Sequence, residues 1–269
     1  MINQKETELL ETAKQATQIG GRILVEKFGT LQQNQIAFKD RGDYVTELDY
    51  RSEEAIIRHI KKHYSHHSIY AEESGKEEGE KYCQWIIDPL DGTANYVQGI
   101  PMFSISIAFV EDKEIKIGVV YDPLREEMFW AEKGKGAFLN GKRIAVSTKK
   151  EMEYGMLGTG FPWRLKPCLD AYLESFKELF LLTTGIRRMG SAALDLAYTA
   201  CGRFDGFWEM KLKPYDIAAG VLLVQEAGGI VTDMRGGNEY MASGNIVGAS
   251  LAMHEQIVHV TKKYLCHVE

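Results

Sequence analysis

The chain has 269 residues, of which 45% are hydrophobic and 26% are charged, and its net charge is −6. Such a composition is ordinary for a folded globular protein, and the length suffices for one large domain or two of about 130 residues. The negative net charge gives no overall attraction to nucleic acid or to anionic lipid, so we expect neither as a partner.

The apolar residues do not predict a membrane protein or an exported one. No run of about 18 apolar residues is present and the first residues are polar, so we expect no transmembrane span and no signal peptide. The four cysteines lie far apart without a C-x-x-C motif, as in proteins whose thiols stay reduced. We therefore predict a cytoplasmic location.

Two amphipathic helices are predicted near the N-terminus, over residues 6–28 and Ser52–Ile60. In front of the second helix, Thr46 and Asp49 have the spacing of a helix-capping pair. Asp49 thus has two interpretations, a cap of its own helix or a residue near a bound metal. Its place in the sequence leaves both open.

The central motif begins with an apolar run, Trp85–Ile87, which predicts a short buried strand. Pro89 lacks an N–H donor and should end that strand. Asp88 and Asp91 lie three residues apart at the predicted strand end. The strand therefore delivers two carboxylates to one place.

Gly92 and Thr93 come directly after Asp91. Gly92 permits a tight bend, and Thr93 suits the N-cap of a helical turn whose free N–H groups favour an anion. Two carboxylates beside a bound anion would repel it unless a divalent cation lay between them, and Mg²⁺ takes both carboxylate and phosphate oxygens. The motif predicts a metal-assisted phosphate site, with a strand end followed by an Asp-Gly turn as the alternative.

Other polar residues at predicted element ends have a structural and a functional interpretation of about equal weight. Glu72 and Glu73 follow a predicted strand and belong either to the site or to the charged loop after them. Asp216 starts a predicted helix and either caps it or joins the site. Glu209 ends a strand, and Ser191 opens a helix whose first N–H groups could meet a ligand.

From Phe103 to Ser147, alternating apolar residues and turn signals predict an antiparallel meander. After about residue 150, strands and helices alternate, which predicts an α/β arrangement. We therefore expect an α+β half over residues 1–147 that carries the metal motifs and an α/β half over residues 148–269 that completes the site.

Three motifs together resemble the inositol monophosphatase family of Mg²⁺-dependent, lithium-sensitive sugar phosphatases. They are Glu72–Gly75, the W-I-I-D-P-L-D-G-T-A-N run over Trp85–Asn95, and Pro214–Gly220. The resemblance covers nearly the whole chain. It implies a layered α/β/α/β/α sandwich, two to three Mg²⁺ ions per site, a small phosphate monoester as substrate, and a homodimer.

The resemblance also implies roles for individual residues. The metal ligands would be Glu72, Asp88, the carbonyl of Leu90, Asp91 and Asp216. The residues implied to act in catalysis, by holding metal or orienting the attacking water, are Glu72, Thr93 and Asp49. The phosphate would meet Gly92, Thr93 and Lys39, and the alcohol part of the substrate would meet Asp91, Ala192 and Glu209.

The reaction that the resemblance implies is in-line attack by a metal-activated water without a phospho-enzyme, with inositol 1-phosphate as the first substrate to consider. Relatives in the wider superfamily act instead on NADP, fructose 1,6-bisphosphate or 3′-phosphoadenosine 5′-phosphate. Candidates for contact with a second phosphate are Arg164, Lys166, Arg187 and Arg188. A non-catalytic regulatory binding protein that kept the fold is the alternative from another class.

Overall fold

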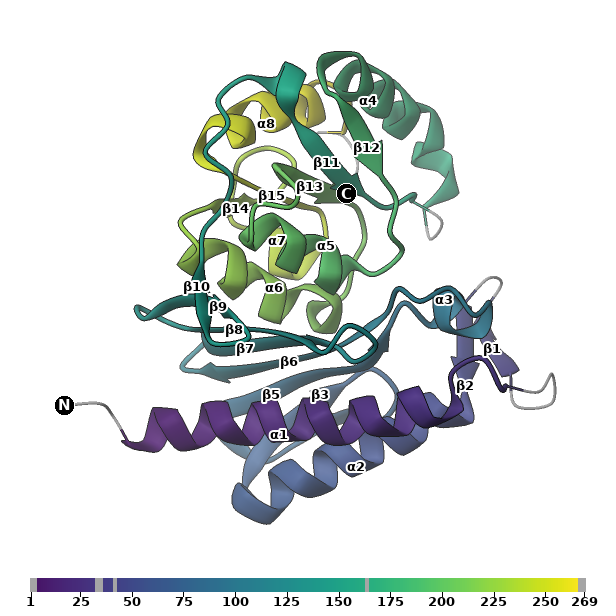
Figure 1. Ribbon diagram of the computed structural model, residues 1–269, viewed down its shortest axis with the longest axis vertical. Helices are drawn as coiled ribbons and strands as arrows, with labels where there is room; N and C mark the ends of the chain where they lie inside the picture. Colours follow the sequence, from purple (N-terminus) through teal and green to yellow (C-terminus); the bar gives the residue numbers. More distant parts are fainter. Residues whose placement is uncertain (1–3, 32–35, 41–42, 163–164, 266–269) are drawn as a thin grey trace.

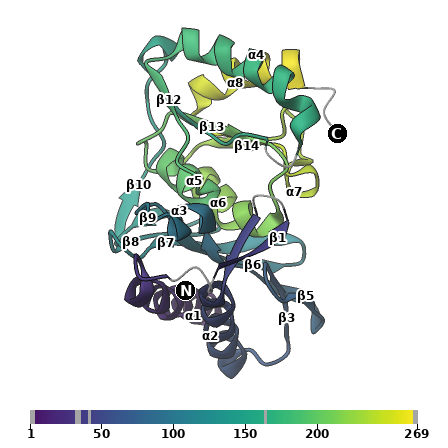
Figure 2. The same cartoon turned by 90° about the vertical axis from the view of Figure 1, so that its right-hand side faces the viewer.

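The structure is a computed structural model that describes residues 4–31, 36–40, 43–162 and 165–265. Its elements form five stacked layers, in which an eight-stranded and a five-stranded sheet alternate with three layers of helices (Figure 1). The predicted α/β/α/β/α sandwich is confirmed. A two-stranded hairpin, β1 (Ile36–Asp40) and β2 (Asp43–Thr46), lies at one side of this stack (Figure 2).

The first layer consists of helices α1 (Gln4–Lys27) and α2 (Glu47–His63), which run side by side across the outer face of the large sheet (Figure 1). Both predicted N-terminal helices are therefore present. The second begins earlier than expected because Thr46 and Asp49 form a complete capping box at its start.

The eight-stranded sheet has the order β10-β9-β8-β7-β6-β5-β3-β4, and only β3 and β5 pair in parallel. The predicted meander is confirmed, since each strand from β5 to β10 pairs antiparallel with the next. The strands of this sheet are β3 (His67–Ala71), β4 (Gly75–Glu77), β5 (Glu80–Asp91), β6 (Ser104–Glu111), β7 (Glu114–Asp122), β8 (Glu127–Glu132), β9 (Gly136–Leu139) and β10 (Lys142–Ile144).

The prediction that Pro89 ends the central strand is wrong, because β5 continues to Asp91. The pairing of β5 with β6 shifts register between Asp88 and Asp91, so Pro89 lies in an irregular stretch where no regular ladder bond is required of it. This irregularity places both carboxylates at the end of one strand.

The third layer consists of α5 (Ala192–Ala200) and α6 (Pro214–Glu226), which fill the space between the two sheets (Figure 1). Both helices are largely apolar and buried, as expected for helices covered on two sides. Close packing of α6 on β7 depends on Gly118, since a Cβ there would lie 2.7 Å from the carbonyl oxygen of Ala219.

The five-stranded sheet has the order β12-β11-β13-β15-β14, and helices α4 and α8 cover its outer face (Figure 1). The alternation of strands and helices predicted after residue 150 is confirmed. These elements are β11 (Met156–Thr159), α4 (Leu169–Leu182), β12 (Gly185–Arg187), β13 (Gly206–Glu209), β14 (Ile230–Thr232), β15 (Ile246–Ala249) and α8 (Leu251–Leu265), with short helices α3 (Thr93–Val97) and α7 (Tyr240–Ser243) at loop positions.

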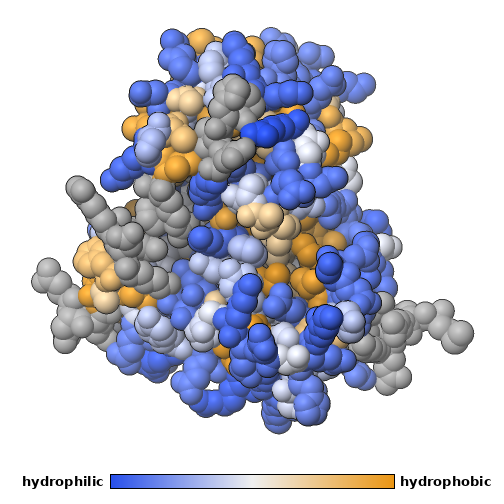
Figure 3. Space-filling model, turned by 180° about the vertical axis from the view of Figure 1, so that it is seen from behind, coloured by the Kyte–Doolittle hydropathy of each residue, from blue (hydrophilic) through white to orange (hydrophobic). Residues whose placement is uncertain are grey.

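In the sequence, all strands of the eight-stranded sheet precede the predicted boundary at residues 147 and 148, and all strands of the five-stranded sheet follow it. Helices α5 and α6, however, pack against both sheets. The division into two halves therefore stays a prediction. Cys83, Cys168 and Cys201 are free thiols, and no helix among the described residues is long and apolar enough to cross a bilayer. On the rear face, hydrophobic residues form small separate patches among hydrophilic ones (Figure 3).

Candidate active site

A cavity of about 530 Å³ opens between the two sheets, beside α3 and the start of α6. It collects residues from segments far apart in the sequence, because strand ends and helix starts of both sheets meet there. Its wall contains nearly all of the residues that the sequence motifs singled out: Glu72, Asp88, Leu90, Asp91, Gly92, Thr93, Ala192, Glu209 and Asp216.

Three aspartates converge at the floor of this cavity. Each of Asp88, Asp91 and Asp216 offers a carboxylate oxygen, and these oxygens all lie within 4.8 Å of one another. All three residues are at most 8% exposed. Asp88 and Asp91 come from the end of β5, and Asp216 comes from the first turn of α6.

Hydrogen bonds within the protein anchor each of these carboxylates. Asp88 Oδ1 accepts from the backbone N–H of Leu90 at 3.0 Å, and Asp216 Oδ2 accepts from the backbone N–H of Lys213 at 2.6 Å. Asp91 Oδ2 accepts from the hydroxyl of Ser191 at 2.5 Å and from the N–H of Ala193 at 2.8 Å. Asp216 thus caps its own helix and also lines the cavity, and its role as a metal ligand stays a prediction.

The electrostatics of this cluster favour a bound cation. Burial raises the pKa of Asp91 to about 6, partly offset by its hydrogen bonds to Ser191 and Ala193, while the charge of Glu72 raises it further. Burial, followed by repulsion from Glu72, Asp91 and Asp216, holds the pKa of Asp88 well above its usual value. Several carboxylates that raise one another's pKa need a positive charge among them to stay ionised together.

The donor atoms in this cluster fit Mg²⁺. Carboxylate oxygens are hard ligands, and Mg²⁺ is bound through a few of them while it retains waters and substrate oxygens. The carbonyl of Leu90 lies in the same wall of the cavity and accepts a hydrogen bond from Thr93 Oγ1 at 3.0 Å. We conclude that Asp88, Asp91 and Asp216 could hold a divalent cation.

Thr93, which lines the cavity, contacts Asp49, the residue with which the family resemblance pairs it. Thr93 Oγ1 lies 3.1 Å from Asp49 Oδ1, while Asp49 Oδ2 accepts from the backbone N–H and the hydroxyl of Thr46. Asp49 therefore uses one oxygen for the helix cap and the other for Thr93. Burial raises the pKa of Asp49 to about 6, although hydrogen bonds from Thr46 oppose this.

The N-cap of α3 is Gly92 and not Thr93, which corrects our prediction. Gly92 has φ 98°, and a Cβ at this position would lie about 3 Å from the carbonyl oxygens of Met102 and Gly190. The left-handed conformation and the close approach both require glycine. Thr93 becomes the first residue of the helix, which leaves its hydroxyl for Asp49 and Leu90.

Glu72 lies in the cavity wall but is not one of the three carboxylates in the tight cluster. It follows β3, and its turn is held by Glu53, a buried residue of α2 that accepts from the N–H groups of Glu73 and Ser74 at 2.8 and 2.7 Å. Glu53 was not among the residues predicted from the sequence. The signal would have been a carboxylate on the predicted buried face of a helix.

Ala192 and Glu209 are both in the cavity wall and both at most 8% exposed. Glu209 packs against Gly160, where a Cβ would lie 1.9 Å from its carboxylate. Lys39 belongs to β1, but its side chain lies outside the described residues, as does Arg164. Lys166 and Arg188 line the cavity, whereas Arg187 is not part of its wall.

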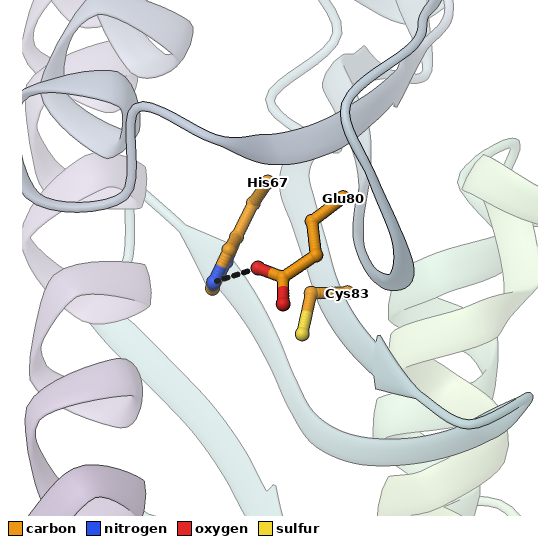
Figure 4. Close-up of side chains that lie close together, drawn as sticks. All are labelled: His67, Glu80 and Cys83. Atoms are coloured by element: carbon orange, nitrogen blue, oxygen red, sulfur yellow. Dashed lines mark ion pairs between the residues drawn. The ribbon is translucent and has the colours of Figure 1, made fainter.

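A second group of metal-ligand side chains lies at the far end of β3 and β5, formed by His67, Glu80 and Cys83 (Figure 4). His67 Nδ1 accepts a hydrogen bond from the indole N–H of Trp85 at 3.1 Å, so the neutral ring carries its proton on Nε2. Nε2 lies 3.9 Å from Glu80. A metal on Nε2 would move the proton to Nδ1 and leave the buried indole N–H facing another donor, so this arrangement does not suit a metal.

Comparison with known proteins places the chain in a family. The model of the inositol monophosphatase family matches residues 5–265. A protein of Pseudomonas aeruginosa named Nus factor SuhB is 43% identical over 263 residues, which cover 96% of this chain and 97% of that protein.

Two solved structures show the same architecture. The extragenic suppressor protein SuhB of Bartonella henselae superposes with a TM-score of 0.92 at 40% identity, covering 95% of this chain and 99% of that one. The IMPase of Thermotoga maritima superposes with a TM-score of 0.89 at 36% identity, covering 97% of this chain and all of that one, 100%. The chain therefore belongs to the inositol monophosphatase family.

Proposed function

We propose that this protein is a Mg²⁺-dependent phosphomonoesterase whose first substrate to consider is inositol 1-phosphate. The observation that carries the proposal is the convergence of Asp88, Asp91 and Asp216 at the floor of a cavity that is also lined by Thr93, whose hydroxyl contacts Asp49. The membership in a phosphatase family supports it.

The proposed metal ligands are Glu72, Asp88, the carbonyl of Leu90, Asp91 and Asp216, for two to three ions. Mg²⁺ bound there would polarise the phosphate, stabilise the leaving alkoxide and lower the pKa of the attacking water. The hydrogen bonds from Leu90, Ser191 and Lys213 fix the orientation of the aspartates before any ligand enters. A fixed orientation avoids reorganisation during the reaction.

Thr93 and Asp49 would position the water. The hydroxyl of Thr93 has one proton and two acceptors within reach, the carbonyl of Leu90 and Asp49. When it donates to Asp49, its lone pairs can accept from a water aimed at phosphorus. The pKa of Asp49, raised by burial to about 6, is near enough to neutral pH for this carboxylate to accept a proton. No nucleophilic side chain is needed in this scheme, so no phospho-enzyme forms.

The remaining proposed contacts concern the substrate. The backbone N–H groups of Gly92 and Thr93 and the ammonium of Lys39 would meet the phosphate, and Asp91, Ala192 and Glu209 would meet the alcohol. Ala192 and Glu209 support this placement because both line the same cavity as the aspartates.

The test is release of phosphate from inositol 1-phosphate, NADP, fructose 1,6-bisphosphate and 3′-phosphoadenosine 5′-phosphate, with Mg²⁺ and with EDTA. We expect turnover only with Mg²⁺, inhibition by millimolar Li⁺, and the highest kcat/KM for inositol 1-phosphate. Phosphate release that continues in the presence of EDTA would contradict the proposal. So would the absence of phosphate release from all four compounds with Mg²⁺.

A second candidate is a regulatory binding protein that kept the fold. Curated relatives at 43% and 44% identity carry the name Nus factor SuhB, which names a factor and not an enzyme. The intact carboxylates weigh for catalysis, and the substrate panel separates the two functions. The homodimer and the cytoplasmic location that we predicted from the sequence remain predictions.

A further inference from the structure

One face of helix α2 lies against the candidate site. Asp49 comes three residues before Ser52 and four before Glu53, so the three side chains share a face of the helix, and all three are buried. Asp49 Oδ1 lies 3.1 Å from the hydroxyl of Thr93, and Ser52 Oγ donates to the carbonyl of Pro89 at 3.2 Å. This face therefore contacts the central motif at two points, and its third side chain, Glu53, contacts a different segment.

Glu53 contacts the turn that follows β3 and carries Glu72. The N–H of Glu72 donates to the carbonyl of Ile87 in β5 at 3.1 Å. The next two N–H groups, of Glu73 and Ser74, donate to the two oxygens of Glu53 at 2.8 and 2.7 Å. The backbone is therefore fixed on both sides of the Glu72 side chain, by β5 before it and by α2 after it.

This contact suits a carboxylate and not an amide. A carboxylate offers only acceptors, and each oxygen of Glu53 receives one backbone N–H. A glutamine would turn its NH₂ donor toward one of the two N–H groups, and that N–H would lose its acceptor. Burying a carboxylate is costly unless it is hydrogen-bonded, so the two bonds to the turn also offset the cost of placing Glu53 at a position that is only 3% exposed.

Glu72 depends on a fixed backbone because it stands apart from the three clustered aspartates. It lines the active-site cavity, and its charge, after the larger effect of burial, raises the pKa of Asp88 and of Asp91. Its carboxylate therefore lies near the cluster without belonging to it. A group that binds a ligand has to be held within about 0.5 Å of its productive position by the residues behind it. For Glu72, those residues include Glu53.

We propose that Glu53 is a positioning residue of the metal site, whose carboxylate holds the turn after β3 in the place from which Glu72 can reach a cation bound by the clustered aspartates. This inference rests on the proposed function, since that function assigns Mg²⁺ to the site and Glu72 to its ligands. Glu53 does not line the cavity, and its two oxygens face the N–H groups of the turn. It therefore acts on Mg²⁺ affinity through Glu72 and not by contact with the metal.

The experiment is a double-mutant cycle measured by calorimetric titration of Mg²⁺ into the metal-free protein. The variants are Glu53→Gln, Glu72→Gln and the two combined. We expect Glu53→Gln to weaken one Mg²⁺-binding step by about tenfold, the lower end of the range for groups that support a metal ligand. Glu72→Gln should weaken the same step at least as much. The combined variant should bind no more weakly than Glu72→Gln alone, because Glu53 acts through Glu72.

The matched control is Asp233→Asn, which separates positioning from a purely structural role. Asp233 also holds a turn, since its Oδ1 accepts from the N–H groups of Arg235 and Gly237 at 2.8 and 2.9 Å, but it does not line the active-site cavity. Both Glu53→Gln and Asp233→Asn should lower Tm, and only Glu53→Gln should weaken Mg²⁺ binding. Wild-type Mg²⁺ affinity in Glu53→Gln, or additive losses in the combined variant, would overturn the inference.

Glu53→Asp takes the place of Glu53→Gln if the latter does not fold, because aspartate keeps the charge and both acceptors on a side chain that is shorter by one CH₂ group. It should weaken the same step, again with no further loss in the Glu72→Gln background. A non-additive loss of Mg²⁺ affinity in a protein that releases no phosphate would support the positioning role while the phosphatase proposal falls. Mg²⁺-dependent phosphate release with full Mg²⁺ affinity in the Glu53 variant would overturn the positioning role while the phosphatase proposal stands. Absence of Mg²⁺ binding in the wild type would overturn both.

Discussion

Two clusters in this protein bring metal-ligand side chains within reach of one another, yet they differ in how those side chains are already engaged. In the first, Asp88, Asp91 and Asp216 are buried and repel one another, and protein donors fix their orientation. In the second, Trp85 donates to His67 and Glu80 is exposed. Proximity alone therefore does not identify a metal site.

The two clusters differ most in the net charge of their side chains, which hydrogen bonds within the protein do not balance in the first cluster. Three buried carboxylates keep an unbalanced negative charge that a cation relieves. A neutral histidine whose Nδ1 accepts from an indole already satisfies both itself and its buried partner, so metal binding there would cost a hydrogen bond. The following predictions test this contrast.

The largest effect is expected for Asp91→Asn. The change removes a charge from the centre of the first cluster, and we expect kcat/KM with Mg²⁺ to fall by on the order of 10³-fold, the scale of losing one group that stabilises developing charge. The matched control is Glu80→Gln in the second cluster, which should stay within about twofold of wild type. An equal loss of kcat/KM in the two variants would show that the two clusters do not differ in function.

A smaller effect is expected for Ser191→Ala, because Ser191 donates to Asp91 and is not itself one of the proposed metal ligands. Loss of its hydroxyl should weaken Mg²⁺ binding by about 10–100-fold, and loss of the N-cap of α5 should cost about 1 kcal/mol of stability. Ser191→Thr, which keeps a hydroxyl, should recover part of the affinity. Unchanged Mg²⁺ affinity in the alanine variant would show that this hydrogen bond does not orient Asp91.

The buried carboxyl groups of Asp91 and of the nearby Asp49 should also make stability depend on pH. The pKa of Asp49 and of Asp91 is raised from 3.8 to about 6 in the folded protein, so between these values the folded state binds more protons than the unfolded state. Stability of the metal-free protein should therefore fall as pH rises through this window.

Mg²⁺ should reverse that trend, because it binds the ionised carboxylates. At a concentration about a hundredfold above Kd it adds about 2.7 kcal/mol, or roughly 5–10 °C in Tm, at about pH 7.5 and less at about pH 5. Thermal melts at the two pH values, with and without Mg²⁺, measure this difference. An equal gain at both values, or an equal gain in Asp91→Asn, would count against the site.

The smallest effect concerns the second cluster. Stoichiometric Zn²⁺ should change the Tm of the wild type no more than that of His67→Gln, because metal binding on Nε2 would leave the indole of Trp85 without an acceptor. Calorimetry that detects a 1:1 Zn²⁺ site in the wild type and not in the variant would refute this interpretation.

Sequence patterns predicted the fold well because the relevant signals are local and periodic. The helices α1 and α2, the meander and the later alternation of strands and helices all follow from spacing of apolar residues. Pro89 was misjudged because its effect depends on the partner strand, whose register shifts beside it. Local pattern could not reveal that irregularity.

Sequence motifs named most of the residues that line the candidate site. They did not predict the hydrogen bonds that hold those residues in place. The sequence left open whether Asp49 and Asp216 cap a helix or belong to the site. In the structure each caps its helix, while Asp49 also contacts Thr93 and Asp216 also lines the cavity. Glu53 was missed, since its partners, the N–H groups of Glu73 and Ser74, lie in a segment that only the fold brings next to α2. A carboxylate has two oxygens, so one can cap a helix while the other contacts a second partner. A capping pattern in the sequence indicates only the first of these contacts.

The most direct test of the central claim is calorimetric titration of Mg²⁺ into the metal-free protein and into the Asp91→Asn and Glu80→Gln variants. We predict binding of two or more ions to the wild type and to Glu80→Gln, and weakened or lost binding in Asp91→Asn. Absence of Mg²⁺ binding in the wild type, or equal binding in all three proteins, would contradict the assignment of Asp88, Asp91 and Asp216 as the metal site.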